Sequence, residues 1–186
     1  RRSSFTQRYL PVKMTKRLIL ISLLFTGLTI QQASACSCVG ESSVEESFRS
    51  SDVVAVGRVI QSDTDWIPDS ARIKEMVAHG FLADSLDKRL YGYYFTRVTV
   101  QIEKIYKGHA EGDTLTVYTG MGRGDCGFRF RQGQQYVIYG HNKSYLDVLL
   151  DNESLPNGRN VYWTNICTRT READQEEIRR IENQKN

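Results

Sequence analysis

The sequence predicts one mainly β domain with short flanking helices, preceded by an export segment. Short segments rich in β-branched and aromatic residues recur at close spacing, and glycine, asparagine or aspartate turns separate them. The 186 residues, 40% of them hydrophobic and 25% charged, suffice for one core. Many short strands at this spacing are typical of a barrel or a sandwich.

An apolar run near the N-terminus indicates export. Lys16 and Arg17 precede the run at 18–30, which has the length of a signal-peptide core and falls short of the roughly 20 residues of a membrane span. The region ends in Ala33-Ser34-Ala35, an A-x-A cleavage signal. Cleavage at this signal would leave Cys36 as the first residue.

We therefore expect two parts. Residues 1–35 would comprise upstream residues and a secretory signal peptide, with Met14 as the true start; an uncleaved anchor helix is the alternative. Residues 36–186 would form the exported domain, extracellular or, in a bacterium, periplasmic or at the cell surface. The net charge of +3 is mild, and no Lys/Arg run interleaves with aromatic residues, so we expect no nucleic-acid partner.

The chain has four cysteines, Cys36, Cys38, Cys126 and Cys167. They form no C-x-x-C pair and the three histidines stand far apart, which argues against a zinc knuckle. In an oxidising compartment an even number indicates disulfides. Bridging Cys36 to Cys38 would close a ring that disulfide geometry disfavours. We expect these two to pair separately with the other two, in an order that the pattern leaves open.

The first elements of the exported domain are a helix and a strand. Ser43 and Glu46 fit the capping box, so a short helix should begin near residue 43. The β-branched run at 51–62 predicts a long strand that bends at Gly57.

Residues 67–90 are predicted to form a helical insertion. Helical spacing places four apolar residues on one face, and Gly80 is the expected break. The four are Ile73, Met76, Val77 and Phe81.

Five further strands and a terminal helix are predicted after the insertion. The strand segments are 93–106, 113–120, 126–130, 135–140 and 144–150. After Cys167 the tail is acidic early and basic later, as suits a helix. Thr168 or Thr170 would cap it, and Ala173, Ile178 and Ile181 would face inward.

Five segments, taken in order, carry a family resemblance: CSCVG at the predicted mature N-terminus, SFRSSDVVAVGRVI, VTVQIEKIYKG, LTVYTGMGRGDCGFRF and NICTRT. In this order the chain resembles the tissue inhibitor of metalloproteinases family, whose inhibitory part is a netrin-like domain. The resemblance covers nearly all of residues 36–182 and implies a single-domain member. It implies an OB-fold-like closed barrel of five to six strands, and disulfides from Cys36 to Cys126 and from Cys38 to Cys167.

The resemblance also implies a mechanism. A free α-amine at Cys36, with an ordinary pKa of about 8, is partly neutral and can bind a metal. Together with the Cys36 carbonyl it could chelate the catalytic zinc of a target protease and displace the zinc-bound water. Ser37 would enter the protease's primed-side pocket, and Cys38 and Val39 would continue the wedge. The partner is then a zinc metalloproteinase; the inhibitor has no cofactor of its own, and we expect a monomer.

Arg123-Gly124-Asp125 has two interpretations. The simpler is a polar glycine turn at a strand end. The resemblance would place the tripeptide beside the N-terminal wedge, as a secondary protease contact.

Other functions remain as alternatives to inhibition. One is a non-inhibitory netrin-like binding module, since fold alone does not fix function. Another is a lipoprotein anchored to a membrane through Cys36; a typical lipobox would have Leu near Ala33, and lipidation would leave Cys126 unpaired. An enzyme is not expected, because no Ser-His-Asp order, H-E-x-x-H or paired-carboxylate signature is present.

Overall fold

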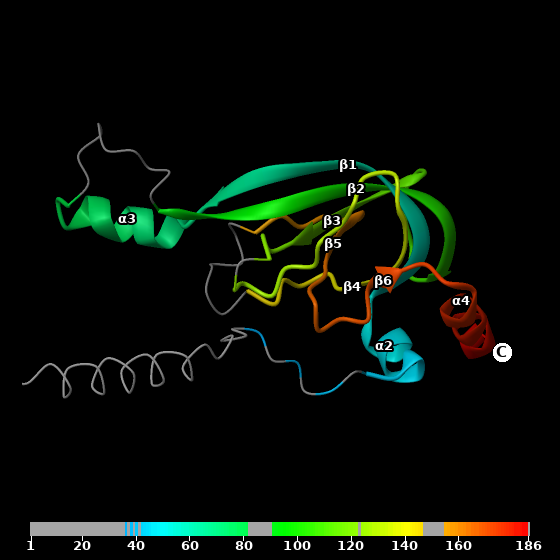
Figure 1. Ribbon diagram of the computed structural model, residues 1–186. Coiled ribbons are helices and arrows are strands. Elements are labelled where there is room, and N and C mark those ends of the chain that lie inside the picture. The colour runs from blue at the N-terminus through cyan, green and yellow to red at the C-terminus, as the bar shows by residue number, and fades with distance from the viewer. Residues whose placement is uncertain are drawn as a thin grey trace, which may run out of the picture. The chain divides into compact units, whose positions relative to one another are not determined.

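The structure is a computed structural model that describes residues 36, 38, 40, 42–81, 91–122, 124–146 and 155–185. These residues form a mainly β domain with a six-stranded mixed sheet and three α-helices (Figure 1). The helices are α2 (Val44–Ser50), α3 (Ser70–Ala78) and α4 (Gln175–Glu182), followed by a 3-10 turn, η2 (Asn183–Lys185). The strands are β1 (Val53–Pro68), β2 (Gly92–Lys107), β3 (Thr114–Thr119), β4 (Gln135–Gly140), β5 (Val161–Trp163) and β6 (Arg171–Glu172). The predicted β class and the C-terminal helix are confirmed. Within these ranges no helix is both long and apolar enough to span a membrane.

The sheet is open, with the order β5-β3-β2-β1-β4-β6. Neighbouring strands are antiparallel except β3 and β5, which run parallel. Directly after β4, His141 exchanges two backbone hydrogen bonds with Trp163 of β5, at 2.9 and 2.7 Å. Strand β5, at one end of the strand order, therefore also contacts the chain directly after β4, at one residue pair.

Strands β1 and β2 form a long ribbon that extends past its neighbours (Figure 1). They pair as far as Pro68 and Gly92, whereas β4 pairs with β1 only as far as Arg58. The register shifts between Val56 and Gly57, at the glycine where the sequence predicted a bend. The outer part of the ribbon is consequently two-stranded, with α3 at its end.

The helical insertion starts later than its pattern predicted. Residues 67 and 68 still belong to β1, because they pair with Tyr93 and Gly92 across the ribbon. The helix spans Ser70–Ala78 and buries none of its residues. Of the predicted apolar face, Ile73 and Met76 are half-buried, while Val77 and Phe81 are 51% and 66% exposed. Residues 82–90 lie outside the described residues.

One predicted strand is not found, and a second is described only at its start. Residues 126–130 form a loop, because side chains bind its backbone N–H groups: Gly127 donates to the carboxylate of Asp125, and Phe128 donates to the hydroxyl of Thr119. At 144–146 the chain turns, and 147–150 fall outside the described residues. Strands β5 and β6 had not been predicted.

The C-terminal helix begins later than expected. Neither Thr168 nor Thr170 caps it; the N-cap is Asp174, whose carboxylate accepts from the N–H of Glu177 at 2.8 Å. Thr170 accepts a hydrogen bond from the N–H of Tyr139 in β4. The predicted inward face is correct, since Ile181 is fully buried and Ile178 and Ala173 pack against the same cluster.

Two hydrophobic clusters hold the sheet and helices together. The first fills the space between β1, β2, β3 and β4, and is composed largely of valines. The second joins α2 and α4 to the sheet through Val44, Val54, Tyr139 and Ile181. The predicted start of α2 at residue 43 is confirmed, with both hydrogen bonds of the Ser43 and Glu46 capping box.

Candidate functional site

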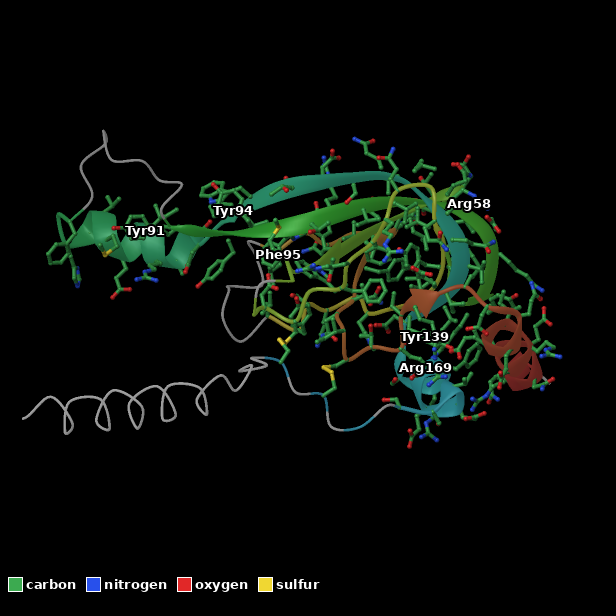
Figure 2. All side chains as sticks on the ribbon, in the orientation of Figure 1. Arg58, Tyr91, Tyr94, Phe95, Tyr139 and Arg169 are labelled. Carbon is green, nitrogen blue, oxygen red and sulfur yellow. A yellow bond between two sulfur atoms is a disulfide. The ribbon has the colours of Figure 1, made fainter. Side chains whose placement is uncertain are left out.

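Two disulfides hold the N-terminal segment, defined here as the described residues 36, 38, 40 and 42, against two loops of the domain. Cys36 pairs with Cys126 and Cys38 pairs with Cys167, with Cα atoms 5.4 and 5.3 Å apart. Figure 2 shows both as yellow bonds. This pairing agrees with the one implied by the family resemblance, and it is compatible with an oxidising compartment.

The carboxylate of Asp125 organises the loop that holds Cys126. It accepts hydrogen bonds from three backbone N–H groups, those of Met121, Gly122 and Gly127. Cys126 itself has a φ of 59°, in the left-handed region that non-glycine residues rarely adopt. A fixed turn, and not a strand, therefore presents Cys126 to Cys36.

Close packing fixes the same loop. A Cβ on Gly127 would lie 2.0 Å from the carbonyl oxygen of Gly120, so no larger residue fits without a shift of the backbone. The hydroxyl of Tyr145 donates to the Asp125 carbonyl at 2.8 Å and accepts from the N–H of Gly120 at 3.1 Å. Burial raises the pKa of Tyr145 to about 12, so its hydroxyl keeps its proton at neutral pH.

The loop that holds Cys167 is built around Asn165. Its side-chain oxygen accepts from the N–H groups of Cys167 and Thr168, at 2.7 and 3.0 Å. The N–H of Ile166 donates to the carbonyl of Cys126 at 2.9 Å. The two cysteine loops are thus bonded to each other as well as to the N-terminal segment.

A third polar anchor lies after Cys38. The guanidinium of Arg169 donates to the Ser42 carbonyl at 2.7 Å, and to both carboxylate oxygens of Glu177 at 2.6 and 2.7 Å. The hydroxyl of Tyr139 donates to the same carboxylate at 2.7 Å. Figure 2 shows Tyr139 and Arg169 near each other beside α2 and α4.

The charges at this anchor are stabilised in the ionised form. Burial alone would raise the pKa of Glu177, but hydrogen bonds from Arg169 and Tyr139 and the nearby charge of Arg171 lower it below its ordinary value. Burial and the hydrogen bond to Glu177 raise the pKa of Tyr139. Glu177 is therefore a carboxylate and Tyr139 a neutral donor at neutral pH.

The structure places some of the predicted site residues and not others. Cys36 and Cys38 are half-buried, and Gly40 turns the chain, with its N–H donating to the Cys38 carbonyl at 2.9 Å. Ser37 and Val39 lie outside the described residues. An amine nitrogen and a carbonyl oxygen on one residue can bind a metal together, so Cys36 could do so once its amine is free.

The Arg123-Gly124-Asp125 tripeptide lies in the Cys126 loop. Gly124 has a φ of 97°, and the carboxylate of Asp125 is occupied by the backbone N–H groups of the loop. Arg123 lies outside the described residues. The structure agrees with the turn interpretation, and the secondary protease contact stays a prediction.

A cavity of about 580 Å³ borders the Cys167 loop. Trp163 and Tyr145 contribute to its wall, and the charged residues that line it are Asp52 and Lys143. His141 also lines it, and burial lowers the pKa of this imidazole. The side chain is consequently neutral at neutral pH.

Sequence reasoning missed the anchor made by Arg169, Glu177 and Tyr139. One signal was present, because Asp174 and Glu177 have the three-residue spacing of a helix cap. That spacing locates the start of α4, but nothing in the pattern indicates that Glu177 is paired with Arg169.

Comparison with known proteins gives no further assignment. No protein-family model matches the chain, and no curated protein matches it.

Proposed function

We propose that the chain is a secreted, single-domain relative of the tissue inhibitors of metalloproteinases, and that it inhibits zinc metalloendopeptidases. The observation that carries the proposal is the disulfide clamp. The two cysteines that follow the predicted cleavage site are each bonded to a separate loop of the domain. A segment ordered in advance loses little conformational entropy on binding.

The proposed chemistry begins with cleavage after Ala35, which converts the Cys36 amide into an α-amine. The amine and the Cys36 carbonyl would form a five-membered chelate with the target's zinc and displace its water. Ser37 would occupy the primed-side pocket, with Cys38 and Val39 continuing along the cleft. Arg123, Gly124 and Asp125 would make the secondary contact.

The proposal includes a finer description of the fold. We propose that strands β1 to β5 close into an OB-fold-like barrel through the contact between β4 and β5. Its support is the pair of backbone hydrogen bonds between His141 and Trp163.

A single added residue tests the mechanism. The mature chain 36–186 is compared with a version that carries one alanine before Cys36, against a panel of zinc endopeptidases. A version with one alanine after Asn186 is the matched control. We expect inhibition by the mature chain and by the control, and none by the N-terminally extended version, because its Cys36 nitrogen is an amide that cannot donate to zinc.

Three outcomes would contradict the proposal. Equal inhibition by all three versions would exclude the α-amine from the mechanism. Inhibition by none of them would favour the binding module. A lipid adduct on Cys36, seen in the intact mass of the exported protein, would exclude the chelate because acylation consumes the amine.

A further inference from the structure

Arg169 occupies an unusual position among the arginines of the described residues. Its side chain is 8% exposed, and that of its partner Glu177 is 3% exposed. By contrast, the guanidinium of Arg58 also joins a backbone carbonyl to a glutamate, but its side chain is 52% exposed. A buried charge is stable only when it is paired and hydrogen-bonded, so the Arg169 contacts are fixed in geometry.

The guanidinium divides its donors between two parts of the chain. Its Nε and one Nη bind the two oxygens of Glu177, in the first turn of α4. The other Nη binds the Ser42 carbonyl, at the end of the N-terminal segment. The planar fork is what allows one side chain to hold both, since a lysine ammonium is a single point from which the donors radiate.

The Glu177 end of this link is held by the core. Glu177 accepts from Tyr139 of β4, and Ile181 of the same helix is fully buried against Val44 and Tyr139. The Ser42 end is held less firmly. Its side chain is exposed, and the segment before it is fixed by the two disulfides.

Along the sequence, both ends of the Arg169–Ser42 contact lie close to the Cys38–Cys167 disulfide. Arg169 is two residues after Cys167, and Ser42 is four residues after Cys38. The disulfide and the guanidinium contact therefore fasten the same short stretch to the same loop at two points. Between the Cys38 disulfide and the α2 N-cap at Ser43, the contact at the Ser42 carbonyl therefore adds a further attachment.

We propose that Arg169 is the positioning residue of the N-terminal segment, and that through it the C-terminal helix sets the orientation of Cys36 and Cys38. The consequence for inhibition rests on the proposed function; the consequence for the order of the segment does not. Arg169 itself does not touch the target in this account, since it acts through Ser42.

The test uses the mature chain 36–186 with Arg169→Lys, which keeps the charge and loses the fork. Tyr139→Phe is the matched control, because it removes a buried hydrogen bond from the same carboxylate and leaves the Ser42 contact in place. Glu177→Gln is the second test variant. It keeps the size of the side chain and weakens the hydrogen bonds that hold the guanidinium. If Arg169→Lys does not fold, Glu177→Gln replaces it in the measurements.

Two measurements need no protease. We expect Arg169→Lys to speed amide hydrogen exchange of the peptide 36–43 by about tenfold, the change that loss of one charge-assisted hydrogen bond would give. We expect dithiothreitol to reduce the Cys38–Cys167 bond faster in this variant, with the rate for Cys36–Cys126 less affected. Glu177→Gln should change both in the same direction, and Tyr139→Phe, which loses one bond to Glu177 but keeps the Ser42 contact, should change both less than Arg169→Lys does.

The third measurement is the inhibition constant against a protease that the wild-type chain inhibits. Arg169→Lys should raise it by about tenfold, for the same lost bond, whereas Tyr139→Phe should raise it less because the Ser42 contact remains. Unchanged exchange at 36–43 in Arg169→Lys and Glu177→Gln would overturn the positioning role, as would an equal increase in Tyr139→Phe. If the wild-type chain inhibits no protease, the proposed function fails, while exchange and reduction still decide the role of Arg169.

Discussion

The N-terminal segment and the α3 end of the β1–β2 ribbon both lie at the periphery of the domain, yet they are held in opposite ways. The segment has two disulfides and a buried guanidinium contact. The helix α3 buries no residue and exposes Val77 and Phe81. The helix has few contacts with distant residues, such as that of Arg72 with the Tyr91 ring, whereas disulfides and a buried guanidinium hold the segment. This difference indicates where the molecule requires a fixed geometry.

The largest expected effect is at the buried anchor. Glu177→Ala removes the carboxylate that binds Nε and one Nη of the buried Arg169, so we expect the free energy of unfolding to fall by about 3–5 kcal/mol. Glu182→Ala is the matched control on the same helix; its ion pair with Lys104 is about half exposed and should be worth less than about 1 kcal/mol. Urea titration measures both. Similar losses in the two variants would mean that the buried pair is not the stronger anchor.

Removing one disulfide should lower the free energy of unfolding by slightly less than Glu177→Ala does. The variant Cys38→Ala/Cys167→Ala frees a loop with a sequence separation of 129 residues, and we expect a loss of about 2–4 kcal/mol. Cys36→Ala/Cys126→Ala, with a separation of 90, should cost nearly the same because the loop term varies only logarithmically. Hydrogen exchange should rise in the N-terminal segment and stay unchanged in α3. Faster exchange in α3 would show that the two regions are coupled.

Acid should weaken the anchor before it affects the ribbon end. The pKa of Glu177 is lower in the folded chain than in the unfolded one, so its contribution is complete above the unfolded pKa of about 4.3 and is lost as the pH falls through the folded value. Glu177→Gln should therefore flatten the decline of stability below about pH 4.3. Glu45, whose pKa is also lowered but which is fully exposed, provides the control variant Glu45→Gln. An equal flattening in both would contradict a special role for Glu177.

The sequence predicts the parts of the fold that depend on local pattern. The capping box at Ser43 and the strand composition of β2 and β4 are local, and the structure contains these elements. The segment 126–130 has a strand-like composition but forms a loop, because Asp125 and Thr119 take its N–H groups. Strands β5 and β6, of three and two residues, are too short to give a periodic signal.

The residues of the candidate site also fall into two groups, those that the sequence predicts and those that it does not. The pattern predicts that the first two cysteines pair with the last two, and the resemblance supplies the order. Arg169 and Glu177 could not be found, because charged residues in a sequence are usually exposed and nothing local marks this pair as buried. Their pairing depends on how α4 packs on β4, which is a property of the tertiary structure.

The smallest expected effect is at the ribbon end. There Val77 of α3 can be compared with Val44 of α2 as a matched pair. Val77 in α3 is 51% exposed, and Val44 in α2 is fully buried. Val44→Ala should cost about 2 kcal/mol, because it removes two buried carbons and leaves a cavity. Val77→Ala should be neutral or stabilising by up to about 0.5 kcal/mol, since alanine has the higher helix propensity and little burial is lost. A loss near 2 kcal/mol at Val77 in urea titration would mean that α3 is buried in solution, by part of this chain or by a second copy. Repeating the titration at several protein concentrations separates these two cases, because only association between copies depends on concentration.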